Sequence, residues 1–207
     1  MVTSRTADAY DEQAIKARLE AAGRRECSLF ATSCAERLFP MYEAFVKRTG
    51  QGDIELLRRA LDFAWDVSGA TEQPLAEIAA RGADAESLVP SDDDEDWTAA
   101  SPIAQNAAAA VAYALRAQLS GDPQDGVWAA RQLYEAADFL VQLAEAEPTY
   151  VQAADDEEPI AVAVAGISAA LDGLGMQSAR EFKTSAREGG ERLRALLQDP
   201  PSGGVLR

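Results

Sequence analysis

Residue types that favour β-strands are sparse along this chain, and no stretch alternates apolar and polar residues as a half-buried strand does. Alanine, leucine, glutamate and arginine dominate instead, and all four are strong helix formers. The sequence therefore predicts an all-α fold. At 207 residues, 47% of them hydrophobic, the chain is long enough to bury the core of one domain.

Apolar periodicity, capping residues and prolines predict about seven to eight helices. Their expected ranges are about 8–22, 25–48, 53–67, 73–82, 102–119, 123–147, 158–173 and 176–198. Asp53 is expected to cap the third helix, and Ser101 the fifth. Short connections and alanine-lined faces indicate a single-domain helical bundle over residues 1–198, followed by a flexible tail at 199–207.

Two interruptions of this pattern stand out. Pro40 lies inside the second predicted helix, so we expect a kink or a break near Leu38 and Phe39. Pro74 is expected in the first turn of the fourth helix. The one long irregular connection covers about 84–101 and is strongly acidic.

The net charge of −16 is unevenly distributed. Residues 91–160 carry 2 basic and 15 acidic residues, which amounts to −13 of that charge. Such a surface repels nucleic acids and anionic lipids and attracts basic partners. The plainer interpretation is that the acidity serves only solubility.

Several classes of protein are not expected. There is no histidine, which removes the commonest general base and metal ligand, and we expect neither a metal site nor a cofactor. Cys27 and Cys34, seven residues apart on one helix, are too distant for a disulfide, so free thiols in a reducing cytoplasm are expected. The start of the chain lacks an apolar signal region, and the run 160–174 is too short to span a membrane.

A motif occupies the second and third predicted helices. The run C-A-E-R-L-F-P-M-Y-E-A-F at 34–45 is followed by Gly52-Asp53, by R-A-L-D at 59–62 and by Trp65. It resembles the signature of the YjaG-like family (domain of unknown function 416), which comprises small all-helical bacterial proteins. The resemblance is good over 34–65 and looser near 89–94, and it implies a cytosolic all-α protein without naming an activity. The motif positions are Cys34, Glu36, Arg37, Pro40, Tyr42, Asp62 and Trp65.

Charged residues within this motif predict a polar contact between helices. Glu36 and Arg37 are adjacent, so their side chains point in different directions. A buried Arg37 would need a carboxylate, and Asp62 and Asp66 are candidates. Arg58 and Asp62 are spaced so that they could pair with each other instead. We favour a structural clasp between the second and third helices over the alternative, a binding pocket built around Arg37.

The acid run and the tryptophan that follows it are the best candidates for a binding site. Its aspartates alternate as at the start of a calcium loop, but Trp97 and Ile103 stand where that loop needs glycine and glutamate. An aromatic residue among carboxylates suits a basic protein partner. The alternative is that Trp97 only packs back onto the bundle. The predicted partner-binding residues are Asp92, Asp93, Asp94, Glu95, Asp96 and Trp97.

The favoured function is therefore a non-enzymatic protein–protein interaction module that docks a basic partner, as immunity proteins or adaptors do. The alternative is a magnesium-dependent phosphohydrolase acting on nucleotides. Glu135 and Asp138 share one helical face and are similar to half of the carboxylate motif of all-helical nucleotide pyrophosphohydrolases, but a partner helix with two such glutamates is missing. A homodimer whose acidity serves only solubility is a third possibility.

Overall fold

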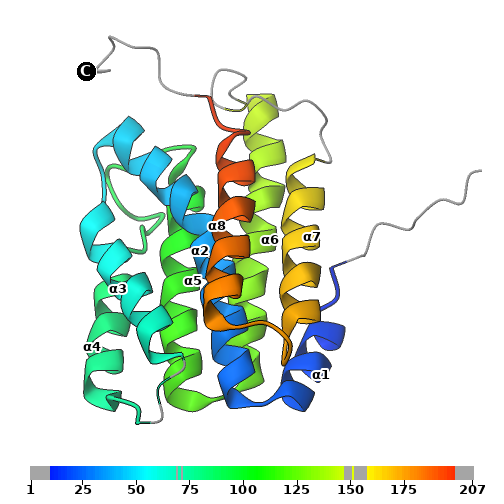
Figure 1. Cartoon of the computed structure of the whole chain (residues 1–207). Coiled ribbons are helices and arrows are strands. Elements are labelled where there is room, and N and C mark those ends of the chain that lie inside the picture. The colour runs from blue at the N-terminus through cyan, green and yellow to red at the C-terminus, as the bar shows by residue number, and fades with distance from the viewer. Residues whose placement is uncertain (1–9, 69, 71, 147–150, 152–157, 199–207) are drawn as a thin grey trace, which may run out of the picture.

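The computed structural model describes residues 10–68, 70, 72–146, 151 and 158–198. Over these residues the chain forms eight α-helices and no strand, and its one described β-pairing is an isolated bridge between Val151 and Leu197 (Figure 1). The all-α prediction is confirmed, whereas the tail predicted at 199–207 lies outside the described residues. The helices are α1 (Glu12–Ala22), α2 (Arg24–Thr49), α3 (Ile54–Val67), α4 (Leu75–Glu86), α5 (Ser101–Ser120), α6 (Pro123–Ala146), α7 (Glu158–Gly173) and α8 (Ala179–Arg194).

Helices α2 and α5 form the centre of the bundle and pack extensively against each other. Helices α3 and α4 cover one side of this pair, while α6, α7 and α8 lie on the other, with α1 beside α6 (Figure 1). Helix α5 approaches its neighbours closely because its buried surface is mostly alanine. The buried alanines of α5 are Ala104, Ala107, Ala108, Ala110, Ala112, Ala114 and Ala117.

The middle of helix α2 is buried on all sides. Every residue from Cys27 to Tyr42 is buried, including Glu36 and Arg37, so these two charges lie in the interior. The break considered at Pro40 does not occur, because α2 remains one helix from Arg24 to Thr49. Its last turns lean away from the bundle toward α3 (Figure 1), as expected where proline lacks the N–H of a helical hydrogen bond.

Several helix ends differ from the sequence predictions. Asp53 caps α3 as expected, since its side chain accepts the Leu56 N–H. Pro74, however, precedes α4 rather than lying in it, and α4 extends to Glu86. Ser101 is the first residue of α5, and its hydroxyl accepts the Thr98 N–H instead of capping the helix. Helix α8 begins at Ala179 behind a capping box of Ser178 and Glu181, a motif that the sequence contains and the prediction overlooked.

The two cysteines are free and buried, as predicted. Within the residues that the structure describes, none of the helices has the length and apolar character needed to cross a membrane.

Candidate functional site

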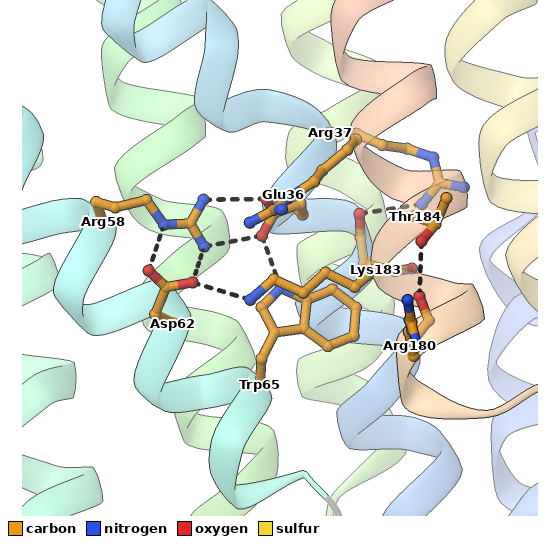
Figure 2. Close-up of polar contacts among 10 residues, drawn as sticks. Glu36, Arg37, Arg58, Asp62, Trp65, Arg180, Lys183 and Thr184 are labelled. Atoms are coloured by element: carbon orange, nitrogen blue, oxygen red, sulfur yellow. Dashed lines mark hydrogen bonds and ion pairs between the residues drawn. The ribbon is translucent and has the colours of Figure 1, made fainter.

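Glu36 of α2 is the centre of a buried polar cluster (Figure 2). Arg58 of α3 donates to it through both terminal nitrogens, Nη1 to Oε1 and Nη2 to Oε2, each at 3.0 Å. The Trp65 indole Nε1 donates to Oε2 at 2.6 Å, and Arg187 Nε of α8 donates to Oε1 at 3.0 Å. One carboxylate of α2 therefore joins the next helix, α3, to α8 at the other end of the chain.

The surroundings of Glu36 keep its carboxylate ionised. Burial by itself raises the pKa of Glu36, but the hydrogen bonds and charge of Arg58, with the hydrogen bonds of Trp65 and Arg187, outweigh it. The pKa of Glu36 is consequently below its ordinary value. A buried carboxylate with this many charge-assisted donors satisfies the condition under which buried charges are tolerated.

Asp62 extends the cluster toward the surface. It accepts from Arg58 Nε at 3.0 Å, from Arg58 Nη2 at 2.7 Å and from Lys183 Nζ at 2.9 Å. Burial raises the pKa of Asp62, but Lys183 and Arg58 lower it more, so the net shift is downward. The Arg58 guanidinium lies over the Phe39 ring, 4.6 Å from its centre.

The predicted clasp between α2 and α3 is thus present, but its central pair is Glu36 and Arg58 rather than Arg37 and Asp62. Adjacent residues on a helix point about 100° apart, so only one of Glu36 and Arg37 can face α3. The i,i+4 spacing of Arg58 and Asp62 did identify that pair correctly. Arg187 and Lys183 could not have been found from sequence, because nothing local links α8 to α2 and α3.

Arg37 points away from this cluster, toward α7 and α8 (Figure 2). Its side chain is only 3% exposed, and its Nη1 donates to the Ser33 carbonyl at 3.0 Å. Its Nε has no hydrogen-bond partner, and none of the described carboxylates forms an ion pair with it. The expectation that a buried Arg37 pairs with Asp62 or Asp66 is wrong, because those residues lie across the opposite face of α2.

The acid run lies on the connection between α4 and α5. Asp92 to Asp96 are exposed, whereas Trp97 is half-buried. Asp94, Glu95, Asp96 and Trp97 line a pocket of about 360 Å³ together with Tyr42 and Phe45 of α2. The remaining lining residues are Gln51, Gly52, Ser87, Leu88, Val89, Pro90 and Ser101, so this lining includes no basic residue.

Hydrogen bonds hold this acidic loop against the body of the molecule. The Ser91 N–H donates to Asp94 Oδ2 at 2.8 Å, and the Trp97 N–H to the Asp94 carbonyl at 3.0 Å. Gln51 Nε2, from the turn after α2, donates to the Asp96 carbonyl at 2.7 Å. The loop and the α2–α3 turn are therefore one structural unit.

Tyr42, a buried residue that lines the pocket, lies where these segments meet. Its Oη accepts the Asp53 N–H at 3.2 Å, and Gly52 lies directly against the ring with a φ of 92°. In the sequence, Tyr42 belongs to a predicted structural motif and the acid run to a separate predicted site. The structure brings them into one pocket, and no sequence signal connected them.

In the part of the chain that the structure describes, Glu135 and Asp138 of α6 are not joined by further carboxylates in a metal-binding arrangement. Partial burial raises the pKa of Glu135, and the nearby charges of Glu12 and Asp138 add to this. Asp138 accepts from Gln142 Nε2 at 2.9 Å. Among the described residues, no three His, Cys, Asp or Glu side chains are grouped so that they could hold a metal ion.

A family model described as a protein of unknown function (DUF416) matches residues 14–133, which is more than half of the chain. The chain belongs to the DUF416 family. The matched segment of this DUF416 protein contains the polar cluster's α2 and α3 residues, Arg37 and the acidic pocket, whereas α7 and α8 lie beyond it.

A solved structure extends the likeness of this DUF416 protein to most of its fold. The crystal structure of a DUF416 family protein from Shewanella baltica is similar with a TM-score of 0.63 at 20% sequence identity. The similarity covers 88% of this chain and 97% of that one. At this identity the likeness concerns the fold alone. No curated protein matches the chain.

Proposed function

We propose that this DUF416 protein is a non-enzymatic binding module of the cytoplasm that docks a basic segment of a partner protein beside its acidic loop. The observation that carries the proposal is the pocket that Asp94, Glu95, Asp96 and Trp97 line together with Tyr42. Aromatic rings accept the stem and charge of a lysine or arginine side chain, and the carboxylates pair with its cationic end. The pocket has both an aromatic ring, that of Trp97, and carboxylates in its lining.

The rigidity of the loop supports the same function. Its acids stand on a backbone fixed by the Gln51 and Ser91 hydrogen bonds, and Gln105 Nε2 also donates to the Pro90 carbonyl at 3.0 Å. A binding surface that is already ordered loses less conformational entropy when a partner docks. The concentration of negative charge in residues 91–160 would also accelerate the approach of a basic partner.

The phosphohydrolase alternative gains no comparable support. Glu135 and Asp138 lack described carboxylate neighbours that could complete a magnesium site with them.

A comparison of two charge-neutralised variants tests the proposal. In the loop variant Asp92, Asp93, Asp94 and Asp96 become Asn and Glu95 becomes Gln. In the control variant five exposed acids on other surfaces are neutralised in the same way, so both variants have the same net charge. The control positions are Glu20, Glu55, Asp66, Glu72 and Glu191.

Binding of a fluorescent Lys/Arg-rich peptide is measured for wild type and both variants at ~0.05 and ~0.5 M salt, where the Debye length falls to about 4 Å. We expect salt-sensitive binding to wild type, a loss of at least about tenfold in the loop variant, and near wild-type affinity in the control. Trp97→Ala alone should weaken binding by about tenfold through loss of the aromatic wall. Equal losses in the two neutralised variants would show that acidity acts only through net charge and would overturn the proposal.

A further inference from the structure

Arg37 is a buried charge without a counter-ion among the described residues. A guanidinium carries five N–H donors, and the structure pairs one nitrogen, Nη1, with the Ser33 carbonyl. Nε is enclosed and unpaired. Burial lowers the pKa of Arg37, which reflects how unfavourable the isolated charge is in this position. A charged group retained under such conditions indicates that an anion belongs beside it.

The side chain lines a pocket between α7 and α8. The pocket has a volume of about 330 Å³, within the range of small-molecule sites. Two glycines make room for the guanidinium stem: a Cβ at Gly166 of α7 would lie 2.8 Å from Arg37 Nε, and one at Gly189 of α8 would lie 3.1 Å from it. Arg37 is thus held between the two helices, where it lines the pocket.

The lining indicates the chemistry of the ligand. One wall is small and apolar, formed by Ala161, Val162, Ala165 and Ala169 of α7. The charged lining residues are two cations, Arg37 and Arg192, and two anions, Glu158 and Glu188. Ser185 adds a neutral hydrogen-bond donor. Two positive and two negative groups favour a ligand with a single negative charge over a dianion such as phosphate, because the glutamates repel additional charge. The planar fork of Arg37 matches a carboxylate geometrically.

We propose that this pocket binds a small organic carboxylate with a short apolar body, and that its carboxylate pairs with Arg37. The site is separate from the acidic pocket, with which it shares no lining residue. It does not depend on the function proposed above. Of the two roles that the sequence left open for Arg37, this proposal takes the alternative one, a binding pocket built around Arg37. The clasp between α2 and α3 was the favoured role.

The test is an NMR titration of the ¹⁵N-arginine-labelled protein, following the Arg37 Nε–H resonance assigned from its absence in Arg37→Met. Three probes are compared at constant ionic strength: sodium butyrate, the neutral isostere butyramide and inorganic phosphate. We expect butyrate to shift the Arg37 resonance saturably, and butyramide to leave it unchanged at the same concentrations. Phosphate should bind more weakly than butyrate.

Variants separate a ligand-binding role from a structural one. Arg37→Met removes the charge while keeping an unbranched side chain. With the Nε–H resonance of Arg192, which also lines the pocket, as the reporter, this variant should reduce butyrate affinity by about 100-fold without lowering the melting temperature. Gly166→Ala should displace the guanidinium and weaken butyrate binding, since its Cβ would lie 2.8 Å from Nε. Gly82→Ala, in helix α4 and away from the pocket, is the matched control. Its new Cβ would make only an ordinary van der Waals contact, with the nearest atom, Leu115 Cβ, at 3.9 Å. It should bind butyrate like wild type.

Three outcomes would overturn the proposal. Equal shifts with butyrate and butyramide would show that the carboxylate is not recognised. Saturable phosphate binding without butyrate binding would assign the pocket to a different ligand class. A large loss of stability in Arg37→Met, with no butyrate-dependent shift in wild type, would mean that Arg37 serves the fold alone.

Discussion

At the scale of the residue, the adjacent charges Glu36 and Arg37 have opposite surroundings. Both are 3% exposed. Glu36 accepts four hydrogen bonds from Arg58, Trp65 and Arg187, whereas Arg37 has one described partner, a backbone carbonyl of its own helix. A fully paired buried charge is a structural element, while an unpaired one is unfavourable for the fold alone. The same helix thus carries a stabilising carboxylate and a ligand-binding cation.

Replacement of Glu36 should be strongly destabilising. Glu36→Gln leaves Arg58 and Arg187 without a buried counter-charge, and we expect a loss of about 3 kcal/mol in the free energy of unfolding, measured by urea denaturation at pH 7. Glu43→Gln on the same helix is the control. Glu43 pairs with Lys47 at 4.0 Å on the surface, and its loss should cost less than about 0.5 kcal/mol.

The effect of Glu36→Gln should depend on pH. Because the pKa of Glu36 is lower in the folded protein than in the unfolded chain, its contribution is complete above the unfolded value of about 4.3. That contribution is lost as the pH falls through the folded value. The difference in stability between wild type and Glu36→Gln should therefore be constant near neutrality and shrink below about pH 4. A difference that does not change down to pH 3 would show that the carboxylate acts by packing and not by charge.

At the scale of the element, the turn between α2 and α3 shapes the acidic pocket. Gly50, which caps the C-terminus of α2, has a φ of 75°, and Gly52 follows with a φ of 92°; other residues adopt these conformations with strain. The second glycine also lies against Tyr42, where a Cβ would be 2.5 Å from the hydroxyl oxygen. This turn carries Gln51, which holds the acidic loop.

The two glycines should therefore differ in their response to substitution. Gly50→Ala, with nothing within 4 Å of the new Cβ, should cost about 1 kcal/mol of unfolding free energy from backbone strain alone. Gly52→Ala should cost about 2 kcal/mol more, because Tyr42 must also move. Thermal or urea unfolding of both variants checks the difference. In a Tyr42→Phe background, which removes the crowded oxygen, the gap between the two variants should narrow; an unchanged gap would exclude this contact as its cause.

At the scale of the whole molecule, α2 is surrounded by other helices over most of its length. Cys27 and Cys34 are fully buried within it. Burial raises the pKa of Cys27 to about 11 and that of Cys34 to about 12. Both thiols are consequently protonated and inaccessible while the bundle is intact.

Thiol labelling should therefore report opening of the entire bundle. Near pH 8, we expect both cysteines to react with a disulfide reagent more than about 1,000-fold slower than a free thiol, at a rate that rises with urea in parallel with unfolding. The variant Ala79→Cys, at an exposed site on α4, should show one additional thiol that reacts at once. Rapid labelling of the two native cysteines at zero urea would contradict a bundle that opens cooperatively around α2.

Local chemistry was sufficient to predict most of the fold. The fold class, the Asp53 cap, the free thiols and the Arg58–Asp62 pair follow from interactions within a few residues, which periodicity and capping patterns record. The starts of α4 and α8 differ by a few residues from the predicted ones. In each case several neighbouring residues could cap the helix or form the preceding turn, and the sequence pattern does not choose among them.

The sites depended on contacts between distant segments. The amino-acid sequence determined that Glu36 and Arg37 face different directions, because adjacent residues on a helix cannot share a face. Only the packing of α3, α7 and α8 around α2 decided that Glu36 meets Arg58 and Arg187 while Arg37 meets an open pocket. Side-chain pairing across 151 residues leaves no periodic signal in a single sequence, since it is set by how the helices pack and not by local backbone preference.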